Sequence, residues 1–354
     1  TISDDIWIDL LSLVGLATIC DIVPLNAVNH KLVKLAIEAL QKTQRPIIKK
    51  LWAQCGLSLN DIDTKDIGFI IGPHINAVGR IEDASHVIEA FTNKTTDYFI
   101  KKMTEYNIQR KNIQSEILKE AEQQALIYIN DPILFLGGNW HIGVIGIVSA
   151  KIAEQFGKPT WLFSREDSSL YKGSARSIPG FNIMDAMEYI GKELFVNYGG
   201  HALAAGFSFE KEDEPQIRQK LIEYAQIVKQ QNPQIWQSKI YYDCRIPLSL
   251  IEPNLSIMIE KLKPFGHGFE EPVFEIQGQI DKIIFYKDKI SQIAKHTGIF
   301  IKRPNLSSIK IMFFNQVIDT IQPSQNAKFL VKVEKSMFNN LITTTLVGID
   351  LEIL

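Results

Sequence analysis

The sequence predicts a multidomain α/β protein of four successive parts: a helical region, a long connecting helix, an α/β region and a small C-terminal β-barrel. Residues 96–128 contain neither proline nor glycine, and their apolar residues recur at helical spacing. Between residues 129 and 232 short apolar runs alternate with helical patterns, which is typical of an α/β domain. After Ile235 short alternating strands and turn residues replace the helices, which favours an antiparallel barrel or sandwich. The predicted boundaries are 1–95, 96–128, 129–232 and 235–354.

Composition limits the possible classes of function. The chain has 354 residues, 45% of them hydrophobic and 22% charged, which suits a globular protein with two or three cores. Its net charge of −2 excludes indiscriminate binding to polyanions, so a nucleic-acid site must be a local basic surface. Three scattered cysteines predict neither a disulfide framework nor a zinc site, and we expect a cytoplasmic protein. The apolar stretch Leu10–Cys20 is too short to span a membrane, and the first residue, Thr1, suggests a piece of a longer chain.

The first predicted helix ends beside an acidic residue. Apolar residues recur at spacings of three and four from Ile6 to Ala17 (Leu10, Leu13 and Val14 among them), Ser3 is available as N-cap, and Pro24 ends the pattern. Asp21 lies in the last turn, where the helix dipole disfavours a carboxylate and burial makes an unpaired charge costly. Two interpretations remain open: a hydrogen-bonded turn carboxylate or a metal ligand. Further helices are expected from Lys31 to Leu40 and from Pro46.

Residues 72–80 are rich in glycine, proline and asparagine, which predicts a flexible loop. Arg80 ends this loop, just before Asp83 or Ser85 caps the next helix. The planar guanidinium of arginine matches phosphate oxygens, and nearby glycines let backbone amides approach them. The alternative is a surface turn in which Arg80 pairs with Glu82.

The connecting helix would be ~50 Å long at 1.5 Å per residue, which suits a strut between two lobes. Asn182 is the predicted cap of a helix in the α/β region. The expected strands of that region are Ile133–Leu136 and Trp161–Phe163, and its expected helices are Val144–Phe156, Ile183–Leu194 and Glu214–Gln231.

Two motifs of the α/β region could receive an anion. Residues 137–146, which include His141, follow a strand and open a helix, so free amides and the helix dipole can face a ligand. In residues 172–177, Ser174 and Arg176 are two positions apart and share one face if the chain is extended. The alternative for this pair is an edge strand with exposed polar residues.

A third motif, residues 198–206, places His201 between a glycine pair, Gly199 and Gly200, and a run of small residues. This composition allows the backbone to come close to a ligand. A lone histidine is more often a hydrogen-bonded core residue than a catalytic group. The flanking glycines weaken that interpretation without removing it.

The predicted barrel interleaves basic and aromatic residues, the mixture that tracks a phosphate backbone and stacks on bases. The alternative, which we favour for most of the aromatic residues, is that they form the barrel core. The residues are Lys287, Lys289, Lys295, Lys302, Arg303, Lys310, Phe285, Tyr286, Phe300, Phe313 and Phe314. The expected strands include Lys239–Arg245, Val273–Gln279, Ile309–Phe314 and Phe329–Val333, with a helix at Asn254–Leu262.

Taken together and in order, these motifs resemble the RecJ family of the DHH phosphoesterase superfamily. The segments that carry the resemblance are Gly15–Leu25, residues 72–80, Trp140–His141, residues 173–177, residues 199–201 and Pro264–Pro272. The resemblance implies the second part of a DHH phosphoesterase domain, the connecting helix, a DHH-associated α/β domain and an OB-fold β-barrel. His74 stands where the family usually has arginine.

The same resemblance implies a metal-dependent 5′→3′ exonuclease that degrades single-stranded DNA to mononucleotides in recombination and repair. Asp21 would be a catalytic ligand of Mn²⁺ or Mg²⁺, and His201 a second catalytic residue. The implied partners are single-stranded DNA, a single-strand-binding protein and a helicase. The resemblance implies no binding to a membrane. Substrate phosphates would be bound by Asn76, Arg80, His141, Ser174, Arg176, Gly199 and Gly200.

Other functions remain open. The family's Asp-x-Asp, second-motif aspartate and Asp-His-His have no counterpart in this sequence, so the chain alone is not expected to assemble a two-metal site. One alternative is therefore a nuclease-inactive subunit that binds single-stranded DNA or a protein partner. Another is a phosphodiesterase for small oligonucleotides or cyclic dinucleotides, against which the additional C-terminal part of about 120 residues, 235–354, counts.

Overall fold

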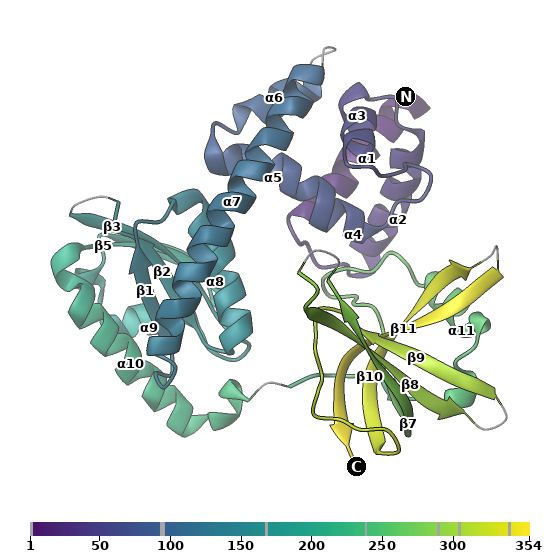
Figure 1. Ribbon diagram of the computed structural model, residues 1–354. Helices are drawn as coiled ribbons and strands as arrows, with labels where there is room; N and C mark the ends of the chain where they lie inside the picture. The colour runs from purple at the N-terminus through teal and green to yellow at the C-terminus, as the bar shows by residue number, and fades with distance from the viewer. Residues whose placement is uncertain are drawn as a thin grey trace. The chain divides into compact units, whose positions relative to one another are not determined.

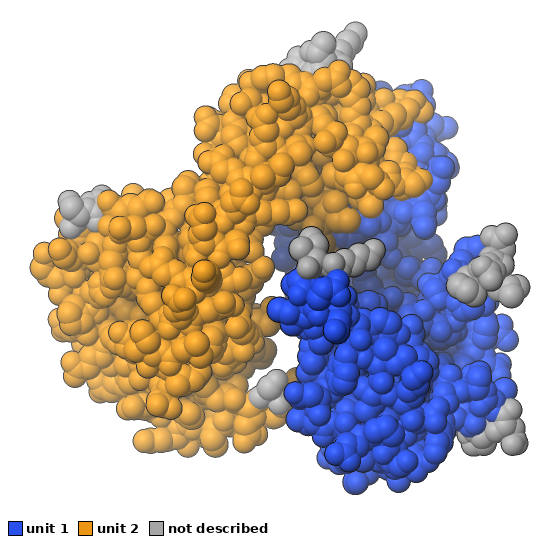
Figure 2. Space-filling model, in the orientation of Figure 1, with its two compact units in different colours: residues 1–43, 60–68, 240–354 blue, residues 44–59, 69–239 orange. Residues whose placement is uncertain are grey.

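The computed structural model divides into two compact units, which Figure 2 distinguishes by colour. Unit 1 comprises residues 1–43, 60–68 and 240–354, and unit 2 comprises residues 44–59 and 69–239. The structure describes residues 3–92, 96–166, 169–237, 239–288, 291–303, 306–338 and 341–354. The predicted boundary at residue 95 and Lys289 lie outside these ranges.

Unit 2 is built around a five-stranded sheet of order β1-β2-β3-β5-β4. Strands β1 and β2 are parallel and are joined through a helix, α8, whereas β3, β5 and β4 add antiparallel pairs. Helices α7 and α8 cover one face, and α9 and α10 cover the other, where an aromatic core forms (Figure 1). The bounds are β1 Leu134–Gly138, β2 Thr160–Ser164, β3 Leu170–Arg176, β4 Asn197–His201, β5 Ala204–Glu210, α7 Asp97–Ile127, α8 Ile142–Phe156, α9 Ile183–Ile190 and α10 Glu214–Gln231.

The predicted α/β region is confirmed nearly element for element. The connecting helix α7 runs for 31 residues, about 45 Å, and the Asn182 side chain caps α9 by accepting from the Met184 amide at 2.9 Å. Helix α9 ends earlier than expected because Gly191, at φ +104°, terminates it. Short 3₁₀ turns follow at Lys192–Leu194, Lys211–Asp213 and Pro233–Trp236.

The predicted flexible loop at residues 72–80 is wrong. These residues form helix α5 (Gly72–Ile81), which continues from a π-helical turn at Ile67–Ile71. Pro73 follows the π-helical turn, and Ala77 and Val78 are buried. This burial outweighs the weak helix propensity of glycine and asparagine. Asp83 caps the next helix as predicted, since its Oδ1 accepts from the Ser85 amide at 2.8 Å. The neighbouring helices are α3 Pro46–Gln54 and α6 Ser85–Thr92.

Unit 1 combines N-terminal helices with the C-terminal sheet. Strands β7, β8, β9, β11 and β10 pair in that sequence and β10 pairs again with β7, so the hydrogen-bonded circuit closes. The isoleucine-rich interior includes Ile276, Ile299 and Phe329, all fully buried. The bounds are α1 Asp4–Cys20, α2 Ala27–Lys42, α4 Thr64–Asp66, β6 Cys244–Arg245, a 3₁₀ turn Leu248–Leu250, α11 Pro253–Glu260, β7 Val273–Lys287, β8 Ala294–Arg303, β9 Leu306–Phe313, β10 Asn326–Phe338 and β11 Leu341–Ile353.

Two predictions for unit 1 need correction. Of the strand expected at Lys239–Arg245 only Cys244–Arg245 forms, because it pairs with β7 over just two residues. In α1, Leu10 and Val14 of the predicted apolar face are exposed. Helix α1 instead buries Ser12, Gly15 and Leu16, because a side chain at Gly15 would collide with Ala36 of α2 (Cβ–Cβ 2.5 Å). Within the described residues no helix has the length and apolar character of a bilayer span.

Candidate functional site

The beginning of helix α8 forms one wall of the site. His141 is its N-cap, and the His141 Nδ1 accepts a hydrogen bond from the Gly143 amide at 3.2 Å. In the neutral ring the proton therefore lies on Nε2, which is able to donate to an anion. Arg80, at the end of α5, donates from Nη1 to the Gly143 carbonyl at 3.1 Å. This bond, rather than the alternative pairing with Glu82, fixes Arg80 at the start of α8.

Ser174 and Arg176 face α8 from strand β3. The Arg176 Nη1 donates to the Ser174 Oγ at 2.9 Å and to the Ala175 carbonyl at 2.8 Å. A Cβ at Gly146, in the first turns of α8, would lie 3.1 Å from the Ser174 Oγ and 3.3 Å from the Arg176 Nη2. The lack of a side chain at Gly146 thus lets the helix approach this pair. The edge-strand interpretation is wrong, since β3 lies between β2 and β5.

Arg110 is a residue that sequence reasoning missed. It projects from α7 and donates to the Asn107 Oδ1 at 2.6 Å and to the Gln114 Oε1 at 2.7 Å. Both acceptors are neutral amides, so they orient the guanidinium without cancelling its charge. The signal was available, because Asn107 and Gln114 flank Arg110 at the i−3 and i+4 positions of a predicted helix.

The three guanidiniums of Arg80, Arg110 and Arg176 influence one another electrostatically. Burial lowers the pKa of each, and the charge of Arg80 lowers the pKa of Arg110 and Arg176 further. All three remain cationic near neutral pH because arginine hardly deprotonates in proteins. Among the described residues no carboxylate forms an ion pair with any of them. An anionic ligand would offset both the cost of burying these charges and the repulsion between them.

Beside these arginines the sheet has a surface of small residues, Ala204, Gly206 and Gly199, which we call the open floor. Arg176 is directly opposite Ala204 on β5, which is opposite His201 on β4, so Arg176 and His201 point to the same face about 10 Å apart. The next row on that face pairs Ser174 with Gly206 and Gly206 with Gly199. A Cβ at Gly199 would meet nothing within 4 Å. Small residues therefore leave the strands bare between the two polar side chains.

His201 is exposed at the end of β4, and no hydrogen bond of its ring occurs among the described residues. The interpretation of His201 as a hydrogen-bonded core residue is therefore wrong. Gly200 has φ +156°, and a Cβ there would lie 2.3 Å from the Ala204 carbonyl. Glycine is needed at 200 to shape the hairpin, whatever ligand it faces. Asn76 is exposed on α5, one turn before Arg80.

Asp21 belongs to unit 1, whereas the other predicted site residues belong to unit 2. It is the C-cap residue of α1, its side chain is exposed, and no described residue makes a hydrogen bond or ion pair with its carboxylate. The hydrogen-bonded interpretation of this carboxylate is wrong. The next residue, Ile22, has φ +55°, a conformation that costs a β-branched residue about 1–3 kcal/mol.

The described side chains do not form a metal site by themselves. Within the described residues no three histidine, cysteine, aspartate or glutamate side chains gather in a way that would hold an ion. Asp21 supplies a single exposed carboxylate, and a two-metal centre needs several shared oxygen or nitrogen ligands. The described part of this chain therefore does not fit such a centre, and we derive no step through a metal.

The pKa of the neighbouring Cys20 thiol depends on the charge of Asp21. Burial, and secondly the Asp21 charge, raise the pKa of Cys20 to about 11. Asp21→Asn removes a negative charge, so the pKa of Cys20 falls, and alkylation of Cys20 at pH 9 is expected to accelerate about two- to fivefold. Peptide mass spectrometry measures this rate, with the exposed Cys244 as internal control. An unchanged Cys20 rate would show that the carboxylate is turned away from the thiol.

The outer face of the barrel carries aromatic and basic residues in register. Lys282, Phe300 and Lys310 are opposite one another on β7, β8 and β9, and further along the first two of these strands Tyr286 is opposite His296. Lys310 lies 5.7 Å from the Tyr286 ring centroid, and the His296 ring lies 5.7 Å from that of Phe314.

We expected most of these aromatic residues to form the barrel core, and that expectation is wrong. Phe313 is fully buried, but Phe285 and Phe314 are 43% and 50% exposed. The rings of Tyr286 and Phe300 are only partly buried. The core is filled mainly by isoleucines, whereas Tyr286 and Phe300 share the outer face with Lys282 and Lys310.

Comparisons with known proteins agree with this architecture. Residues 127–226 match the DHHA1 domain, and residues 242–348 match the RecJ OB domain. The crystal structure of RecJ with Mg²⁺ from Thermus thermophilus matches with a TM-score of 0.80 at 21% identity, over 97% of this chain and 52% of that chain. The corresponding structure with Mn²⁺ gives a TM-score of 0.79. The fold is thus that of RecJ, with a DHHA1 α/β domain and an OB domain.

Sequence relatives carry the same name. The single-stranded-DNA-specific exonuclease RecJ of Bacillus subtilis is 30% identical over 342 residues, which are 94% of this chain and 42% of that protein. The protein of the same name from Salmonella typhimurium is 30% identical over 282 residues, which are 75% of this chain and 48% of that protein. The chain thus spans less than half the length of these relatives. With both domain matches and these relatives in agreement, the chain belongs to the RecJ family.

Proposed function

We propose that this chain carries the strand-binding part of a 5′→3′ exonuclease that degrades single-stranded DNA to mononucleotides in recombination and repair. Arg80, Arg110 and Arg176, with Ser174 and the amino end of α8, would bind a phosphate of the strand. The observation that carries the proposal is the convergence of three guanidiniums without a carboxylate partner among the described residues. His201 would contact the strand from the other side of the open floor.

The outer face of the barrel supports the same substrate. Exposed aromatic rings beside lysines suit a flexible strand whose bases can stack and whose phosphates stay in reach. A duplex offers its bases only at groove edges. We therefore expect binding without sequence preference and favour single-stranded over double-stranded DNA. A single-strand-binding protein and a helicase are the protein partners that this substrate suggests, and the cytoplasm is the expected compartment.

Cleavage would need Mn²⁺ or Mg²⁺, the ions held by the two Thermus thermophilus structures. Asp21 would be one ligand of that centre in the full-length product of the gene. Incubating that product with manganese and a 5′-labelled single strand should release mononucleotides. If it releases none and yet binds the strand, the protein is a binding subunit rather than a nuclease.

Binding of a single strand should depend on the salt concentration. If the three arginines each neutralise one phosphate charge, the logarithm of affinity should fall against the logarithm of salt with a slope of about 2. Raising salt from about 50 to about 200 mM would then weaken binding of a 5′-phosphorylated oligothymidylate roughly 20-fold. Fluorescence anisotropy measures this, with the matching duplex as control. An affinity independent of salt would contradict a phosphate site.

A further inference from the structure

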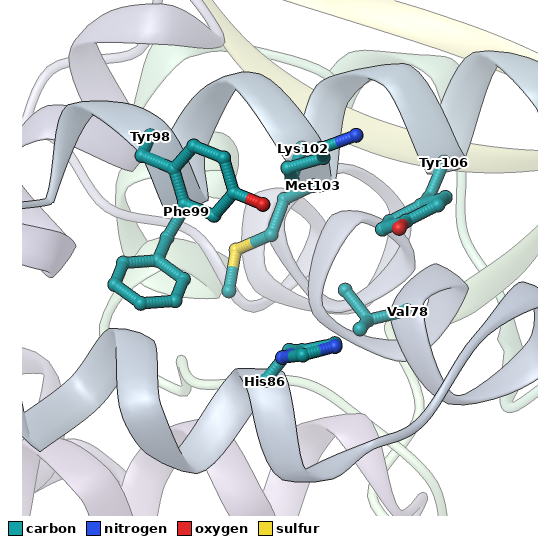
Figure 3. Close-up of a pocket in the computed structure, with 7 residues that line it drawn as sticks. All are labelled: Val78, His86, Tyr98, Phe99, Lys102, Met103 and Tyr106. Carbon is teal, nitrogen blue, oxygen red and sulfur yellow. The ribbon is translucent and has the colours of Figure 1, made fainter.

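A pocket in unit 2 has no role in the site described above. Helices α5, α6 and α7 enclose a hollow of about 310 Å³, a volume that includes its open mouth. Figure 3 shows Phe99 and Met103 reaching from α7 toward His86 and Val78 on the facing helices. The remaining lining residues are Tyr98, Lys102 and Tyr106.

The pocket is apolar at its base and polar at its rim. Val78 and Met103 are each only 2% exposed, whereas Tyr98 is 66% exposed. The Lys102 ammonium lies 5.7 Å from the Tyr106 ring centroid and 3.6 Å from the Glu105 carboxylate. The His86 ring lies 3.3 Å from the Glu89 carboxylate. A flat ring that has polar edges fits such a lining, because its faces contact the aromatic side chains and its edges meet the tyrosine hydroxyls and the lysine.

The helix register relates this pocket to the arginines. At about 100° per residue, the pocket residues Phe99, Met103 and Tyr106 lie on the same face of α7 as Arg110. Tyr106 precedes Arg110 by four residues, a rise of about 6 Å, which is the scale of one nucleotide. Arg110 is in turn close enough to Arg80 for its pKa to be lowered. A strand whose phosphate contacts Arg110 has a neighbouring base within reach of the pocket.

We propose that the pocket between α5, α6 and α7 binds one nucleobase of the strand whose phosphate the arginines hold. This inference rests on the proposed binding of single-stranded DNA and adds a base site to it. Because the lining contacts ring faces rather than one pattern of donors and acceptors, any of the four bases is accepted. The site would hold the strand in register along α7.

A paired series of ligands and variants tests this. The ligands are a 5′-phosphorylated oligothymidylate and versions in which each of the first four nucleotides in turn is abasic. Tyr106→Ala is expected to weaken binding of the complete strand about five- to a hundredfold. Tyr106→Phe should weaken binding less than Tyr106→Ala does, because it keeps the ring and loses only the hydroxyl. Tyr98→Ala, which alters an exposed ring, should weaken binding without unfolding α7, and Tyr189→Ala on α9 is the matched control.

The decisive result would be one abasic ligand on which Tyr106→Ala no longer weakens binding. There the unaltered chain and the variant should bind equally, while the defect persists at the other positions. A defect that is the same for every ligand would overturn the base site and assign Tyr106 a structural role. If Arg176→Ala abolishes binding and Tyr106→Ala leaves it intact, only the base site fails. If the unaltered chain binds none of the strands, the proposed function fails with it.

Discussion

Arg176→Ala is expected to weaken binding of a 5′-phosphorylated single strand about 10- to 100-fold without lowering the melting temperature. Each hydrogen bond to a charged group contributes about 1.5–3 kcal/mol, and the variant removes the guanidinium that faces α8. Stability should stay constant or rise slightly, because the substitution removes one of three mutually repelling cations. Fluorescence anisotropy gives the affinity, and a thermal melt gives the stability.

Arg165→Ala is the matched control for Arg176→Ala. Arg165 also belongs to unit 2, but its guanidinium pairs with Glu214 at 2.6 Å and so is already neutralised. Its removal costs the same formal charge and should change the affinity less than about twofold, as expected for an exposed ion pair. Equal losses of affinity in the two variants would mean that only net charge matters, and the convergence of arginines would have no special role.

The second large effect is expected at Gly200. Gly200→Ala places a Cβ at φ +156° and 2.3 Å from the Ala204 carbonyl, so it should lower the free energy of unfolding of unit 2 by about 2–4 kcal/mol. Urea unfolding followed by tryptophan fluorescence measures this. Four of the five tryptophans, Trp52, Trp140, Trp161 and Trp236, belong to unit 2, so the signal reports mainly on that unit.

Gly199→Ala separates the structural role of the glycine pair from its binding role. Its Cβ would meet nothing within 4 Å, so the change in stability should be within about 0.5 kcal/mol. The added methyl group projects onto the open floor, where only a ligand would touch it. If Gly199→Ala lowers the free energy of unfolding as much as Gly200→Ala does, other residues cover the open floor in solution.

The sequence predicted the α/β region well because its signals are local. Asn182 caps a helix with its own side chain, and the spacing of Ser174 and Arg176 fixes a shared face once the strand forms. That face becomes a candidate binding surface only because Gly206 on β5 and Gly199 on β4 have no side chains to cover it. That arrangement depends on strand order, which spacing alone does not determine.

Errors arose where distant contacts decide local structure. Residues 72–80 look like a loop by composition, but burial of Ala77 and Val78 makes them a helix. The apolar residues of α1 predicted the wrong buried face, because the small Gly15 packs against Ala36. Arg110 was overlooked because it lies within an ordinary amphipathic pattern. Its neighbours Asn107 and Gln114 indicate only that the guanidinium is oriented, and its place in the arginine cluster comes from Arg80, thirty residues earlier.

The route of the chain between its two units determines which unit can fold first during synthesis. Because the chain passes from one unit to the other after residues 43, 59, 68 and 239, unit 1 needs both its earliest helices and its last strands. The Leu25 amide, for example, donates to the His267 carbonyl at 2.6 Å, and the Thr64 hydroxyl donates to the Phe265 carbonyl at 2.6 Å. Residues 69–239 hold the whole five-stranded sheet and can begin to fold on the ribosome. Helices α1 and α2 must wait until translation reaches the barrel, and until then they remain exposed to chaperones and proteases.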